Sequence, residues 1–124
     1  MRFAGRLVQQ AELPEYSIQL SVITMDDDEI LALNNSVLGH DWFTDILTVE
    51  IEREKDALEA EIYLGVQQAQ ANALKYRNSI EDELIRLIVH GMLHLAGYDD
   101  HTPEGKKRMR QRERFFIRKS VQAS

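Results

Sequence analysis

Residues 79–97, from Ser79 to Gly97, read SIEDELIRLIVHGMLHLAG and contain the most apolar helical pattern of the chain. The apolar residues of this stretch cover most of the circumference of a helix, so we expect a buried helix from Glu81 to Ala96 at the centre of the molecule. Ser79, with Asp82 three residues later, resembles a capping box at the start of this helix. Gly97 suits a left-handed cap at its end.

The segments around this helix alternate between strand and helix patterns without a strict repeat. Alternating or continuous apolar residues predict strands at Glu15–Thr24, Asp45–Ile51 and Leu58–Leu64, with a further edge strand at Phe3–Gln9. Helices are predicted from Asp26 to about Gly39, over Val66–Tyr76, and from Thr102-Pro103 onward. We therefore expect an α+β fold with a small mixed four-stranded sheet and helices packed on it.

Length and composition favour one globular domain over residues 1–124. The chain has no cysteine, which excludes disulfides, cysteine zinc fingers and a thiol nucleophile. No apolar run is long enough to span a bilayer, and the N-terminus lacks the pattern of a signal peptide. From the sequence alone we expect a cytoplasmic protein with no membrane contact, acting as a monomer.

The charge is distributed unevenly along the chain. Between Lys106 and Lys119 there are eight basic residues and one acidic residue, a net charge of +7, whereas the chain as a whole carries −6. The remainder therefore carries −13. Such a basic helix on an acidic protein is typical either of a contact with phosphates or of a solvated face, and charge alone does not separate the two.

His90 and His94 are the residues that point most directly to chemistry. Four residues apart on a helix, both imidazoles project from one face and can share an ion. The spacing is that of the helical half of the zincin motif HExxH, here as HxxxH. Gly91 stands where a metalloprotease has its general-base glutamate, so the motif supplies metal ligands without the base for peptide hydrolysis. The plain alternative is a pair of ordinary helix histidines.

A third ligand is expected from the turn after Gly97, where the chain can fold back toward the ion. The candidates are Asp99, Asp100 and His101. A catalytic zinc typically has three protein ligands and one open position for water. Asp99 has two other possible roles: it could orient a ligand imidazole, or it could simply form the turn.

At these residues the sequence resembles the YbeY family of bacterial metal-dependent endoribonucleases, also called rRNA maturation factors. The family signature HGxLHLxGYDH matches residues 90–99 of this chain and departs at the last position, where Asp100 replaces the third histidine. Two registers follow: Asp100 serves as an oxygen ligand, or a one-residue insertion brings His101 into place. The spacing to Met109 and Glu113 fits the family only when counted from Asp100, so we prefer Asp100 and keep His101 as the alternate ligand.

Weaker similarity extends upstream, so that the resemblance covers about residues 26–113. The family element TDVLSF corresponds to the run that begins at Thr44-Asp45, and these two residues are expected to shape a cleft or bind substrate. The family's active-site arginine would align with Leu38, which removes the usual cationic assistant. Trp42 and Phe43 could stack on an unpaired base, or they could form a hydrophobic plug.

The resemblance implies a zinc-dependent, single-strand-specific endoribonuclease acting in 16S rRNA 3′-end maturation and ribosome quality control. It implies one Zn2+ per chain, with His90, His94 and Asp100 as metal-binding and catalytic residues, and the ribosomal small subunit with its proteins as partner. The basic helix would hold RNA through Lys106, Lys107, Arg110 and Arg114. Two alternatives stay open: a non-catalytic ribosome assembly factor with a structural metal, and another metallohydrolase such as a peptidase.

Overall fold

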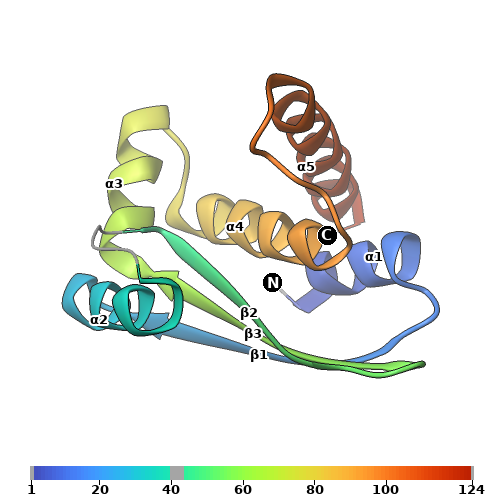
Figure 1. Ribbon diagram of the computed structural model, residues 1–124. Coiled ribbons are helices and arrows are strands. Elements are labelled where there is room, and N and C mark those ends of the chain that lie inside the picture. Colours follow the sequence, from blue (N-terminus) through green and yellow to red (C-terminus); the bar gives the residue numbers. More distant parts are fainter. Residues whose placement is uncertain (1, 40–43, 124) are drawn as a thin grey trace.

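The computed structural model describes residues 2–39 and 44–123. The elements, in chain order, are α1 (Arg2–Glu12), β1 (Ser17–Met25), α2 (Asp27–Leu38), β2 (Ile46–Arg53), β3 (Ala57–Gly65), α3 (Val66–Tyr76), α4 (Ile80–Leu95) and α5 (Pro103–Ala123). Figure 1 shows α4 lying over one face of the sheet, with α1 beside it and α5 above it, and both of these helices contact α4. The expected α+β class is confirmed.

The sheet has three strands within the described residues, in the order β1-β3-β2. β1 pairs with β3 in parallel, and β2 pairs with β3 in antiparallel orientation with a bulge between Glu50 and Glu52. The expectation of a fourth strand at Phe3–Gln9 is wrong, because this segment belongs to α1. In a strand, Ala4, Arg6 and Val8 would share one face. In the helix Ala4 and Val8 are buried while Arg6 is exposed, which avoids burying a charge.

Helix α4 forms the centre of the core, as its apolar circumference predicts. It contacts α1, α3, α5, β2 and β3, and its side chains at Leu87, Val89, Met92 and Leu93 are buried. None of the helices in residues 2–39 and 44–123 is long and apolar enough to cross a membrane.

The ends of α4 follow the capping signals of the sequence. The Ser79 hydroxyl accepts a hydrogen bond from the Asp82 N–H at 3.0 Å, which satisfies one donor of the first turn. At the other end Gly97 has a φ of +100°, a conformation that favours glycine. The N–H groups of Gly97 and Tyr98 donate to the carbonyls of His94 and Leu93. This Schellman motif turns the chain back toward the face of α4 that carries the histidines.

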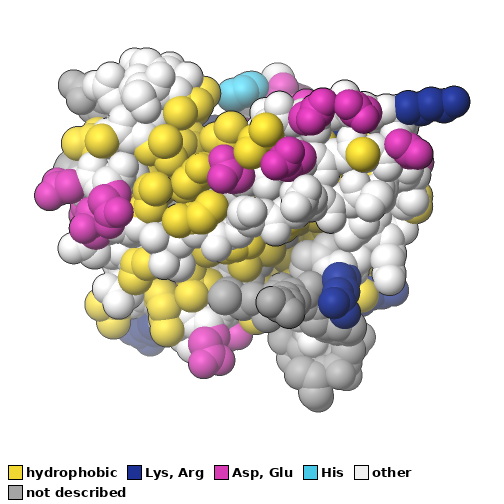
Figure 2. Space-filling model, turned by 90° about the horizontal axis from the view of Figure 1, so that it is seen from below, with side chains coloured by type: hydrophobic (Ala, Val, Ile, Leu, Met, Phe, Trp, Pro, Cys, Tyr) yellow, Lys and Arg dark blue, Asp and Glu magenta, His cyan; other side chains and the backbone are white. Residues whose placement is uncertain are grey.

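Seen from below, the face of the molecule formed by the sheet carries a broad hydrophobic area bordered by acidic side chains (Figure 2). Lysine and arginine side chains are fewer on this view, and a histidine is visible at its edge. The negative charge predicted for the chain outside α5 is thus visible on this side.

Candidate metal centre

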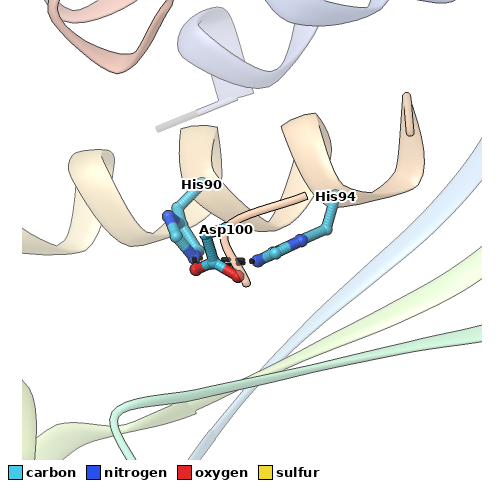
Figure 3. A group of neighbouring side chains, drawn as sticks. All are labelled: His90, His94 and Asp100. Carbon is cyan, nitrogen blue, oxygen red and sulfur yellow. Dashed lines mark hydrogen bonds and ion pairs between the residues drawn. The ribbon is translucent and has the colours of Figure 1, made fainter. Parts of the chain in front are cut away.

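His90 and His94 lie on one face of α4 with their rings directed toward each other and toward Asp100 (Figure 3). The two Nε2 atoms are 2.9 Å apart. The Asp100 Oδ2 atom is 3.6 Å from His90 Nε2 and 3.7 Å from His94 Nε2. Donor atoms placed tetrahedrally about 2.1 Å from one zinc ion lie about 3.4 Å apart, and the three distances bracket that value. The three side chains can therefore hold one metal ion.

The hydrogen bonds on the far side of each ring determine which nitrogen is free to bind a metal. His94 Nδ1 is 3.1 Å from the Tyr98 carbonyl oxygen, and His90 Nδ1 is 3.1 Å from Glu113 Oε2. A carbonyl and a carboxylate only accept hydrogen bonds, so in the neutral rings the proton lies on Nδ1. Both Nε2 lone pairs then face each other and the Asp100 carboxylate. Such converging lone pairs need a cation between them, either a proton shared by the two Nε2 atoms or a metal ion bound by all three side chains, so the donor set suits a metal.

The structure places Asp100, rather than His101, beside the two histidines. The side chain of His101 is 87% exposed, and its ring nitrogen Nε2 lies 3.6 Å from Asp99 Oδ1 instead of near His90. Asp99 also accepts a hydrogen bond from the His101 N–H at 2.8 Å, so it stabilises the turn as a turn residue does. Among the described residues, His101 joins only a second, more exposed acidic group with Asp99 and Asp100.

A charged network of Glu83, Arg86 and Glu113 leads to Nδ1 of His90, and the sequence reasoning missed it. Arg86 donates two hydrogen bonds to Glu83, at 2.9 and 2.7 Å, and one to Glu113 at 3.3 Å. Hydrogen bonding to Glu83 raises the pKa of the Arg86 guanidinium above its ordinary value, so this group stays charged. The available signal was the spacing, because Arg86 precedes His90 by four residues and shares its helix face.

A cleft of about 530 Å³ opens beside the histidines and is lined by both of them. Thr44 and Asp45 lie on its wall, and Leu38 lines it with its side chain half exposed. The Thr44 hydroxyl donates to the Ile46 carbonyl at 3.0 Å, and Asp45 accepts from the Asn72 amide at 3.0 Å. Trp42 and Phe43, considered above as stacking residues, lie outside the described residues.

The predicted RNA-binding cations lie on the outer face of α5. Lys106, Lys107, Arg110 and Arg114 are all exposed. Over residues 2–39 and 44–123, none of these four makes an ion pair. The opposite face of α5 is buried through Met109, Glu113 and Phe116. The basic face is therefore separate from the packed face and open to an anionic partner.

Two glycines bring the backbone close enough to build the site. A Cβ atom at Gly91 would lie 2.9 Å from Ile62 Cδ1 and 2.9 Å from Thr48 Oγ1, so α4 packs on the sheet without room for a side chain here. A Cβ atom at Gly105 would lie 2.2 Å from the Asp99 carbonyl oxygen. The start of α5 thus packs directly against the turn that carries Asp100. The sequence reasoning did not single out Gly105.

Comparisons with known proteins agree on one family. The family model described as Endoribonuclease YbeY matches residues 2–120. An endoribonuclease YbeY from Cytophaga hutchinsonii is 36% identical over 83% of this chain and 73% of its own length. One from Chlorobium phaeovibrioides is 40% identical over 69% of this chain, which spans 57% of that relative.

A solved structure gives the same result at the level of the fold. The solution structure of a Thermotoga maritima protein superposes with a TM-score of 0.64 at 28% identity, covering 94% of this chain and 75% of that protein. The sequence match and the shared fold lead to one conclusion: the chain belongs to the Endoribonuclease YbeY family.

Proposed function

We propose that this protein is a zinc-dependent endoribonuclease that cuts single-stranded RNA. The observation that carries the proposal is the convergence of His90, His94 and Asp100 at the edge of a cleft, in a chain of the Endoribonuclease YbeY family. Two imidazoles and one carboxylate form a ligand set that suits zinc at catalytic sites. A bound zinc ion would supply Lewis acidity toward a phosphoryl oxygen and a water molecule of lowered pKa.

The number of donors supports a catalytic rather than a structural metal. The three side chains leave a fourth tetrahedral position, and His101 is directed away from it within the described part of the chain. An assembly factor with a purely structural metal would instead be expected to close the shell. The peptidase alternative is disfavoured at Gly91, because a glutamate side chain there would collide with Ile62 and Thr48.

We extend the proposal to the RNA and its setting. The substrate is the 3′ end of 16S rRNA, and the enzyme also acts in ribosome quality control. Its partner is the small ribosomal subunit, in the cytoplasm. The enzyme works as a monomer with one zinc ion. The exposed cations of α5 support an RNA backbone contact, because an otherwise acidic protein repels RNA elsewhere. Thr44 and Asp45, on the cleft wall, are the proposed substrate contacts nearest the metal.

Cleavage of a labelled single-stranded rRNA fragment by zinc-loaded protein tests this proposal. We expect wild-type cleavage to stop with a chelator and to return with added zinc, and duplex RNA of the same sequence to stay intact. His90→Ala and His94→Ala should lower both zinc binding and cleavage by at least about a hundredfold while the far-UV circular dichroism is retained. Absence of cleavage by fully zinc-loaded wild-type protein, with and without small ribosomal subunits, would sink the enzymatic proposal.

A further inference from the structure

A chain of hydrogen bonds runs from buried Glu83 to Nδ1 of His90, the ring nitrogen opposite the one that faces the metal position. Arg86 holds both oxygens of Glu83, through Nε at 2.9 Å and Nη2 at 2.7 Å. Its remaining Nη1 donates to Glu113 Oε1 at 3.3 Å. The other oxygen of Glu113, Oε2, lies 3.1 Å from His90 Nδ1. Each oxygen of Glu113 therefore has a separate partner, one on either side.

Burial makes this chain of contacts specific. The side chains of Glu83 and Glu113 are only 2% and 8% exposed, so each buried carboxylate requires a partner. The planar guanidinium of Arg86 reaches both at once, which the single ammonium of a lysine cannot do in the same geometry. Asn72 donates to Glu83 Oε2 at 3.2 Å and completes the surroundings of that carboxylate. The orientation of the Glu113 carboxylate is thereby fixed.

We propose that Glu113 is a positioning residue of the metal centre, oriented by Arg86, that keeps the proton of His90 on Nδ1 and its Nε2 lone pair toward the ion. The inference rests on the proposed binding of zinc by His90, His94 and Asp100. It differs from the support of His94, whose Nδ1 contacts a backbone carbonyl that no substitution removes. Of the two histidines, His90 is therefore the one whose protonated nitrogen a side-chain substitution can change.

The substitution Glu113→Gln discriminates sharply, because the two ends of an amide are not equivalent. Arg86 can only donate, so it takes the amide oxygen of the new residue. The amide NH2 group then faces His90 Nδ1, which must accept. The His90 proton moves to Nε2, so metal binding at that nitrogen then requires the proton to return to the disfavoured Nδ1 position. The side chains have nearly the same size, so packing around residue 113 is retained.

The first measurement is the tautomer of His90 by 15N NMR of the imidazole nitrogens, made on metal-free protein at a pH where the ring is neutral. Wild-type protein should show Nδ1 protonated, and Glu113→Gln should show Nε2 protonated. The second measurement is zinc affinity by competition with a chromophoric chelator. Glu113→Gln should weaken it by about 10- to 100-fold. Arg86→Lys should weaken it in the same direction, because the fork that aligns Glu113 is lost.

Matched controls make the same two types of substitution, Glu→Gln and Arg→Lys, at residues away from His90. Glu104→Gln lies in the first turn of α5, on an exposed residue, and Arg108→Lys alters an exposed arginine of the same helix. Both should keep the wild-type tautomer and zinc affinity. A folded Glu113→Gln protein with wild-type affinity and tautomer overturns the positioning role while leaving the zinc site intact. If wild-type protein itself binds no zinc, the proposed function fails, whereas an unaltered tautomer in Glu113→Gln would separately reject the positioning role.

Discussion

His94 and His90 are held in place by acceptors of different kinds. The Nδ1 atom of His94 contacts the Tyr98 carbonyl, which the Schellman turn at Gly97 brings back toward the helix. The Nδ1 atom of His90 contacts the carboxylate of Glu113. Both arrangements direct Nε2 to the same point, yet the first depends on backbone geometry and the second on a buried side chain. Single substitutions should consequently affect the two histidines differently.

The identity of the third ligand can be tested at single residues. Asp100→Asn keeps the size of the side chain and removes the anionic oxygen that faces both Nε2 atoms. We expect zinc affinity to fall by more than tenfold, whereas His101→Ala, at an 87% exposed side chain, should leave it unchanged. Isothermal or chelator-competition titration measures both. The opposite pattern would assign the third position to His101.

The close packing at Gly105 can be tested by substitution. Gly105→Ala places a methyl group against the Asp99 carbonyl, which is backbone and cannot swing aside. We expect a loss of about 1–3 kcal/mol in the free energy of unfolding, measured in urea, together with weaker zinc binding as Asp100 shifts. The matched control is Gly5→Ala in α1, where the nearest atom would be Ile88 Cγ2 at 4.0 Å. That change should stabilise the protein by about 0.5–1 kcal/mol. Equal effects at the two glycines would contradict the close-approach explanation.

Helix α5 has two faces with different roles. Its inner face buries Met109, Glu113 and Phe116 against the core. Its outer face carries cations four residues apart at Lys106, Arg110, Arg114 and Arg118, a stripe about 18 Å long. Like charges at this spacing disfavour an isolated helix. The burial of the inner face offsets that cost, and an RNA backbone on the outer face would relieve it.

The combined substitution Lys106→Gln, Arg110→Gln, Arg114→Gln tests the outer face. We expect weaker binding of single-stranded RNA and a salt dependence, as log affinity against log salt, lowered in slope by about 2, since each phosphate contact on a single strand contributes about 0.7. Fluorescence anisotropy at several salt concentrations measures both. The combined substitution Lys55→Gln, Lys75→Gln, Arg77→Gln, at exposed residues outside α5, removes the same three charges as a control. A triple variant that binds RNA with the wild-type salt slope would remove α5 from the RNA interface.

Three segments that are far apart in the sequence meet at Glu12 of α1. The Tyr98 hydroxyl donates to Glu12 Oε2 at 3.0 Å, and Arg112 of α5 donates through Nε to Oε1, also at 3.0 Å. Burial, and then the bond to Glu12, raise the pKa of the Tyr98 hydroxyl above its ordinary value. The turn that leads to Asp100 is thereby attached to both helices that flank α4.

Glu12→Gln should loosen this junction as a unit. We expect a loss of about 1.5–3 kcal/mol in the free energy of unfolding, because hydrogen bonds to a partly buried charge are replaced by weaker neutral ones. Native-state hydrogen exchange should show faster opening of α1 and of the start of α5 than in wild-type protein. Glu15→Gln, at an exposed residue just after α1, is the control. If the two variants unfold alike, Glu12 does not join the three segments.

Local sequence signals determined the elements whose residues interact mainly with near neighbours. The helix start at Asp26, the cap at Ser79 and the turn at Gly97 lie where they were predicted, because each signal acts within one turn of its own helix. The spacing of His90 and His94 likewise fixed two thirds of the candidate site, since a helix places residues four apart on one face. The N-terminal segment was predicted wrongly as a strand, because a short apolar run does not reveal its period until a partner surface such as α4 selects it.

The tertiary structure alone decided what surrounds the histidines. Residues separated by more than twenty positions meet there, as His90 meets Glu113, and no local pattern encodes such a contact. It also brought Asp100, the residue preferred from the spacing to Met109 and Glu113, to the pair instead of His101. The packing of Gly105 on the Asp99 carbonyl sets the path of that turn. The local pattern of residues 79–97 was thus enough to predict the helix and its two imidazoles. The packing of α5 against α4 decided the third side chain and its supports, because their positions depend on long-range contacts.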